Sequence, residues 1–210
     1  MRIRTSLLVL LMMTGALAVS QAQQQVAPHA ATPENVEKAR QEAQNKPPQS
    51  APTVSSVLDK SLEGVEKEFV SAAEAMPAEK YNFAPTNGEF KGVRTFAQQV
   101  KHVAAVNHLI FSLMLGEAPP KDGDENGPAS IKTKDDIVQY LKDSFALGHR
   151  ALAAMDESNY VAPIPSPFGG GSTTTRLRLA VLIVGHCFDH YGQMVEYLRM
   201  NGIVPPASRQ

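Results

Sequence analysis

The chain has 210 residues, a formal net charge of −1 at pH 7 and one cysteine, Cys187. The near balance of charge, without clustered lysine and arginine, excludes a surface that binds nucleic acid by neutralising its phosphates. A single cysteine cannot form an internal disulfide, so packing must stabilise the fold. We interpret Cys187 as a buried structural thiol because its neighbours in the sequence are apolar.

Residues 1–22 have the pattern of an export signal. Arg2 and Arg4 precede an apolar run from Leu7 to Val19, and residues 20–22, Ser-Gln-Ala, offer a small-x-small cleavage site. The apolar run is shorter than the roughly 20 residues that a membrane-spanning helix needs. The sequence therefore predicts an exported, periplasmic protein that has no membrane anchor after cleavage. The alternative is that the signal stays uncleaved as an N-terminal anchor.

Residues 23–52 are rich in glutamine, alanine and proline and contain no aromatic residue. Such a segment buries too little apolar surface to offset the entropy lost on ordering. We expect a disordered linker in which Pro33 to Ala43 forms a transient polar helix and His29 is solvated. Residues 53–210 are then predicted to form one domain.

Four later segments carry apolar residues at steps of three and four, as helices that bury one face do. They are residues 53–76, 93–115, 133–155 and 176–200. Pro77 ends the first helix and Gly116 the second, while the hydroxyl of Thr133 is placed to cap the amide of Asp136 at the start of the third. No segment sustains a period of two, so the predicted fold is an all-α four-helix bundle.

Long loops are predicted to connect these helices. Residues 156–174 contain three prolines and three consecutive glycines and are expected to be a loop. The connection over residues 116–132 is long enough, when extended, to cross the full length of a helix. It therefore permits the second and third helices to run parallel, although its length alone does not decide the topology.

His186 and His190 lie four residues apart in the last helix, so both imidazoles project from one face. His102, in the second helix, is the best candidate for a third ligand of a shared metal ion. The spacing alone is also typical of ordinary surface or core histidines. Three neutral imidazoles would leave a position open for water, as in catalytic metal sites, and would suit zinc or nickel, with iron and copper as alternatives.

The remaining histidines of the domain fit this site less well. His108 is six positions from His102 and points about 240° around the helix, so it is expected to face the surface or a loop. His149, on the third helix, is either a fourth ligand or a solvent-exposed residue.

Several residues around the histidine pair have two interpretations. Gly185 and Gly192 reflect either the close approach of a substrate or tight packing of helices. Gln193 is suited to hydrogen-bond a substrate or a residue that supports a ligand. Tyr191 and Tyr197 are either similar polar contacts or core residues.

Two separated motifs resemble the DinB-like superfamily. They are MPAEKYNFAPTNGEFKGVRTFAQQVKHVA, residues 76–104, and HCFDHYGQMVEYLRMNGIVPPASR, residues 186–209. The resemblance covers essentially all of the chain after Pro52. It implies a four-helix bundle in which one histidine of the second helix and two of the fourth bind a divalent metal, here His102, His186 and His190.

The resemblance also implies a range of functions, since relatives include thiol-dependent S-transferases, hydrolases and isomerases. We expect a metal-dependent enzyme, of the thiol S-transferase or hydrolase type, that acts on an unknown small molecule. The alternative is a noncatalytic envelope protein that holds a metal or a ligand, because no nucleophile triad or pair of carboxylates is visible. Export argues mildly against thiol transfer, since small thiol cofactors are mainly cytosolic. An apolar bundle face would support a homodimer, although no separable stripe marks an interface.

Overall fold

The computed structural model describes residues 32–45, 51–121 and 124–209, and contacts divide the chain into two units, Met1–Pro47 and Pro48–Gln210. The first unit contains α1 (Pro33–Gln44), whose residues are all exposed and whose N-terminus is capped by the side chain of Thr32. The predicted polar helix is therefore present. The predicted export signal and His29 lie outside the described residues. Among the described helices, none has the length and apolar character needed to cross a membrane.

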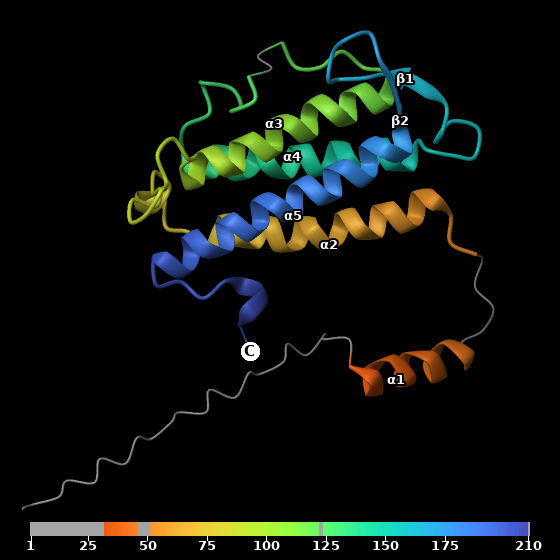
Figure 1. Cartoon of the computed structure of the whole chain (residues 1–210), viewed down its shortest axis with the longest axis horizontal. Helices are drawn as coiled ribbons and strands as arrows, with labels where there is room; N and C mark the ends of the chain where they lie inside the picture. Colours follow the sequence, from red (N-terminus) through yellow and green to blue (C-terminus); the bar gives the residue numbers. More distant parts are fainter. Residues whose placement is uncertain (1–31, 46–50, 122–123, 210) are drawn as a thin grey trace, which may run out of the picture. The chain divides into compact units, whose positions relative to one another are not determined.

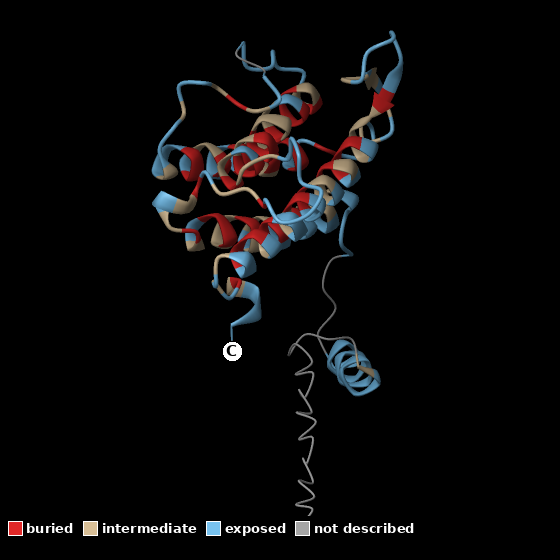
Figure 2. Ribbon diagram, turned by 60° about the vertical axis from the view of Figure 1, so that its left-hand side comes forward, coloured by how far each residue is buried: buried red, intermediate tan, exposed pale blue. Residues whose placement is uncertain are grey.

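Four long helices form the second unit, and they pack around one apolar core (Figures 1 and 2). They are α2 (Val54–Ala75), α3 (Phe96–Leu115), α4 (Lys134–Ala153) and α5 (Arg176–Met200). Two short 3-10 helices, η1 (Ala78–Lys80) and η2 (Pro206–Ser208), follow α2 and α5. The largest core side chains include one phenylalanine of α2, two of α3 and one of α4: Phe69, Phe96, Phe111 and Phe145. The predicted four-helix bundle is confirmed.

The helix α2 packs against α4 and α5, and α3 packs against the same two helices. Lys134, at the start of α4, donates to the carbonyl of Met76 at the end of α2, with an Nζ to O distance of 2.8 Å. At the opposite ends, the hydroxyl of Ser55 donates to the carbonyl of Leu152 over 2.6 Å. The helices α2 and α4 are therefore antiparallel.

The helices α3 and α4 run in the same direction (Figure 1). Along α3, His108 stacks on Tyr140 of α4, and Phe111, one turn later, lies against Gly148 of α4. The loop between these helices thus returns along the bundle, as its length in the sequence permits.

Threonines cap all four helices of the bundle, each through a hydroxyl that accepts from a backbone amide three residues on: Thr53, Thr95, Thr133 and Thr175. The predicted cap at Thr133 is confirmed. The backbone of Thr95 is still extended and its hydroxyl caps the first turn, so α3 begins at Phe96 and not at Val93. Gly116 ends α3 with a left-handed φ of 73°, which only glycine adopts without strain.

The segment before α5 is not entirely loop, so the prediction for residues 156–174 is wrong in part. The strand β1 (Pro163–Pro165) pairs antiparallel with β2 (Thr173–Thr175). Strands of three residues are too short to produce a recognisable alternation in the sequence. The hairpin leads directly to the cap of α5 at Thr175.

Candidate metal centre

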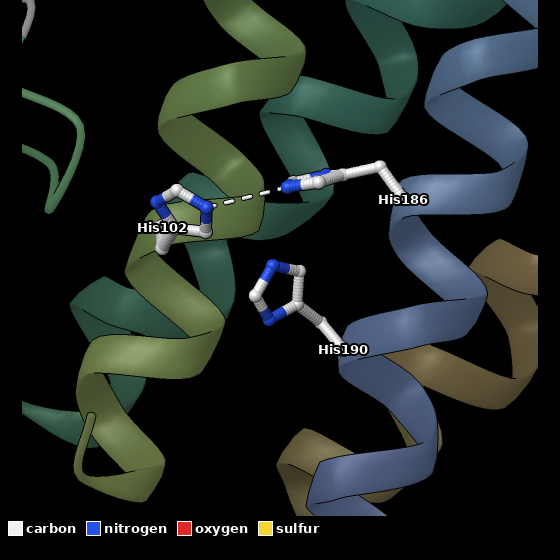
Figure 3. A group of neighbouring side chains, drawn as sticks. All are labelled: His102, His186 and His190. Carbon is white, nitrogen blue, oxygen red and sulfur yellow. Dashed lines mark hydrogen bonds between the residues drawn. The ribbon is translucent and has the colours of Figure 1, made fainter. Parts of the chain in front are cut away.

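Three histidines converge between α3 and α5 (Figure 3). His102 comes from α3, and His186 and His190 come from successive turns of α5. One nitrogen from each ring lies within 4.8 Å of the other two, and Nε2 of His186 is 3.2 Å from Nε2 of His102. The structure thus brings together all three predicted ligands.

Contacts at both ends of α3 and α5 set the register that aligns these histidines. At one end, the guanidinium of Arg176 donates to the carbonyl of Met114, with an Nε to O distance of 2.8 Å. At the other, the hydroxyl of Tyr197 donates to the carbonyl of Arg94 over 3.0 Å. Tyr197 is buried, as predicted for a core residue. The antiparallel pair is therefore held above and below the cluster.

His102 is oriented by the loop between α3 and α4. Its Nδ1 lies 2.6 Å from the carbonyl oxygen of Glu125. A carbonyl only accepts hydrogen bonds, so Nδ1 carries the proton and Nε2 keeps its lone pair. That lone pair is on the nitrogen that faces His186.

His190 is oriented by a chain of two amides that ends on a carboxylate. Gln193 donates from Nε2 to Asp189, which leaves its Oε1 to accept from Nε2 of Gln99 at 2.8 Å. The Oε1 of Gln99 therefore accepts from Nδ1 of His190, at 2.6 Å. The direction of the chain leaves the lone pair of His190 on Nε2. Gln193 supports a ligand, as predicted, whereas the role of Gln99 was not foreseen.

Burial keeps all three imidazoles neutral. It lowers the pKa of His102, and it lowers the pKa of His186 and of His190 to about 4, with further contributions from neighbouring imidazoles and from Arg94. Nδ1 of His186 is buried and has no hydrogen-bond partner among the described residues. At neutral pH the cluster thus presents uncharged nitrogens, which is the state in which histidine binds a metal.

The distance between the ligand nitrogens of His102 and His186 fits a divalent ion. Zinc–nitrogen bonds of about 2.0–2.1 Å in a tetrahedron place two ligand nitrogens about 3.3 Å apart. The distance between the Nε2 atoms of His102 and His186 is 3.2 Å. The hydrogen bonds made by Nδ1 of His102 and of His190 are also those that support metal-binding imidazoles in general.

Two other histidines lie away from the cluster. His108 is half-buried and stacks on Tyr140, with ring centroids 4.7 Å apart, so the predicted surface or loop-facing position is wrong. His149 is neither a fourth ligand nor fully exposed. Its Nδ1 lies 2.6 Å from Asp59 and its Nε2 lies 2.8 Å from Glu66, so both nitrogens contact carboxylates of α2.

Gly185 and Gly192 face open space. A Cβ atom built at either position would meet no atom within 4 Å outside the local helix backbone. Tight packing of helices within the chain therefore does not account for them. Tight packing does account for Gly148, where an added Cβ would lie 2.6 Å from the ring of Phe111 and 2.8 Å from Leu62.

Cys187 is a structural thiol, as predicted. It is fully buried in the core, and its Sγ lies 3.7 Å from Oδ1 of Asn107 on α3. Burial raises the pKa of Cys187 to about 12, so the thiol stays protonated at neutral pH.

The profile of the DinB superfamily matches residues 61–194 of the chain. The chain is also similar to a conserved protein from Enterococcus faecalis whose crystal structure is known. The two superpose with a TM-score of 0.58 at 18% sequence identity, over 71% of this chain and 98% of the other. At that identity the likeness shows the fold alone. None of the curated proteins compared with the chain matches it significantly.

Proposed function

This chain belongs to the DinB superfamily, and from that premise we propose that His102, His186 and His190 bind one divalent metal ion and that the protein is a metal-dependent enzyme. Zinc or nickel is the ion that we propose, since imidazole ligands suit both, with iron and copper as alternatives. The observation that carries the proposal is the convergence of three neutral ring nitrogens, two of which have the opposite nitrogen hydrogen-bonded.

The chain supplies three ligands, so a tetrahedral ion would keep one position for water or a substrate atom. A divalent ion at such a position lowers the pKa of bound water or stabilises a thiolate, which are the activations that a hydrolase and a thiol S-transferase need. Glu125 and Gln99 hold the rings of His102 and His190 in place. Burial lowers the pKa values of the three imidazoles, so they stay unprotonated at neutral pH.

A noncatalytic protein that holds a metal or a ligand is the second candidate. It is favoured by the carboxylates around the cluster, whose hydrogen bonds go to residues other than the three histidines. Asp189 accepts from Gln193, and the side chain of Glu125 accepts from Arg94. No described carboxylate is hydrogen-bonded to the three histidines, so proton transfer is not assigned to any of them.

Metal analysis of the purified protein tests the site. We expect one ion per chain in the wild type and a severe loss of metal in His186→Ala, because two imidazoles bind far more weakly than three. His108→Ala is the matched control, since it removes an imidazole outside the cluster. Far-ultraviolet circular dichroism should show retained helicity in each variant, because the apolar core does not depend on the ion. Full metal occupancy in His186→Ala would show that the site is wrong.

Turnover separates the two candidate functions. The metal-loaded protein is screened for consumption of electrophiles with added thiols, and for hydrolysis of esters and amides without them. Turnover that a chelator abolishes and added metal restores supports the enzyme. Stoichiometric metal with no turnover in any screen supports the binding protein.

Export to the periplasm and homodimer formation stay predictions. Mass spectrometry of the protein from its native host should find a mature N-terminus near Gln23. A chain that begins at Met1 in the cytoplasmic fraction would contradict export.

A further inference from the structure

A cavity of about 440 Å³ lies beside residues that orient the histidine cluster. Three of its lining residues also support the cluster: Glu125 orients His102, and Gln99 and Gln193 form the chain that orients His190. The other lining residues are Gly92, Val93, Arg94, Gln98 and Asn126. A molecule in this cavity would therefore contact the groups that hold two of the three proposed ligands.

Arg94 is the one cationic residue that lines this cavity. The hydroxyl of Tyr197 donates to the backbone carbonyl of Arg94. The side chain of Arg94 is 31% exposed. Its Nη2 lies 3.3 Å from the carboxylate of Glu125, and its Nε lies 3.4 Å from the amide oxygen of Asn126. Both contacts are long for hydrogen bonds to a guanidinium, which shows that its donors are weakly engaged.

We propose that Arg94 binds a carboxylate of the small molecule on which the metal centre acts, a proposal that rests on the proposed function of the histidine cluster. The cavity joins the guanidinium to the residues around the cluster, so one molecule would contact both.

Two features select a carboxylate. A guanidinium presents a planar fork of donors that matches the two oxygens of a carboxylate. The carboxylate of Glu125 already occupies part of that fork, and its side chain is 70% exposed, so an incoming carboxylate can replace it without a rearrangement of the core. Amide side chains complete the walls: Gln98, Gln99, Asn126 and Gln193.

A purely structural role for Arg94 makes the opposite prediction for one variant. If Arg94 only fastens the loop at Glu125, then Glu125→Gln loosens the loop and weakens binding at the site. If Arg94 receives a substrate carboxylate, Glu125→Gln removes the competing internal carboxylate and strengthens binding of an external one. The backbone carbonyl that orients His102 is the same in both proteins.

The test uses zinc-loaded full-length protein and isothermal titration calorimetry. The probes are mercaptoacetate, 3-mercaptopropionate and 4-mercaptobutyrate, each beside its neutral amide, so that thiol and chain length are matched. For at least one length we expect the wild type to bind the carboxylate about tenfold more tightly than the amide, as for a hydrogen bond to a charged group. Arg94→Gln should lose this preference and keep its zinc. Arg178→Gln, an exposed arginine on α5, is the charge-matched control and should keep the preference.

The Glu125→Gln protein should bind the preferred carboxylate severalfold more tightly than the wild type. The proposal is overturned if the wild type binds acid and amide equally, if Arg94→Gln keeps the preference, or if Glu125→Gln weakens carboxylate binding. A wild type that takes up no metal would contradict the proposed function instead. In that case succinate and succinamide are titrated into the metal-free protein. A preference for succinate that Arg94→Gln loses would support the role of Arg94, and equal binding of the two would overturn it.

Discussion

Between α3 and α5, two buried imidazoles hydrogen-bond to neutral oxygens, of a backbone carbonyl and of an amide, whereas between α2 and α4 one imidazole contacts two carboxylates. Burial lowers the pKa values of the histidines in the first region. In the second region burial also opposes the charge, but the hydrogen bonds that the ring donates to Glu66 and Asp59 outweigh it and raise the pKa of His149.

The difference shows that the partners of a histidine decide its role. A neutral acceptor fixes the proton on one nitrogen and leaves a lone pair on the other, so the ring is ready to bind a metal. Two carboxylates occupy both nitrogens of His149 and favour the imidazolium, so this ring joins two helices and has no lone pair to offer. The histidines between α3 and α5 are thus arranged to bind a ligand, whereas the histidine between α2 and α4 is arranged to form an ion pair.

Among the variants that test this comparison, we expect Gln99→Leu to have the largest effect, which is a loss of metal affinity. The change removes the buried oxygen that accepts from Nδ1 of His190. Loss of such a supporting hydrogen bond lowers metal affinity about 10- to 100-fold in known metal sites. We expect a loss in that range, measured by competition with a chromogenic chelator, while the helix content stays unchanged.

The matched control is Gln139→Leu, which makes the same change at an exposed position of α4. It should leave metal affinity as in the wild type. Equal metal affinities of Gln99→Leu and the wild type would show that the orientation of His190 does not depend on the amide chain.

A second comparison uses one glycine from each region. Gly148→Ala would place a Cβ 2.6 Å from the ring of Phe111, and overpacking of this kind costs about 1–3 kcal/mol in the free energy of unfolding. Gly185→Ala, on the exposed face of α5, meets no neighbour and should gain about 0.5–1 kcal/mol from helix propensity. Urea unfolding of both variants measures these differences, and a destabilised Gly185→Ala would mean that this face contacts something that the single chain does not show.

The helices could be predicted from the sequence because their signals are local. Apolar spacing, the threonine at Thr133 and the glycine at Gly116 each act within a few residues, and the structure places helix ends there. The pair His186 and His190 could be predicted for the same reason, since four residues make one helical turn. The hairpin before α5 was missed because each of its strands has only three residues.

The partners in the supporting contacts could not be predicted, because these contacts join residues far apart in the chain. Gln99 meets His190 across 91 positions, and His149 meets Asp59 across 90. Gly148 is tightly packed whereas Gly185 is free, although both are single glycines within helices. Only the packing of one helix against another distinguishes such residues, and no local pattern records it.

The smallest expected effect tests the charge of His149. Its raised pKa means that the folded state holds the proton more tightly than the unfolded state. The contribution to stability is therefore complete below the unfolded pKa of about 6.5 and is lost as pH rises through the raised folded value. Because the side chains of His149, Asp59 and Glu66 are 33%, 46% and 30% exposed, we expect no more than the roughly 0–1 kcal/mol of partly exposed ion pairs.

Urea unfolding of the wild type and His149→Gln at about pH 6 and about pH 9 measures this contribution, and the wild type should exceed the variant by more at the lower pH. His108→Gln is the control of opposite sign. Burial lowers the pKa of His108, so its protonation in the unfolded state makes the wild type lose stability, relative to the variant, as pH falls through about 6.5. Added salt should shrink the effect at His149 by screening the carboxylates, while it leaves the effect of burial at His108 nearly unchanged. The same pH trend in both variants would mean that the carboxylates of α2 do not hold a proton on His149.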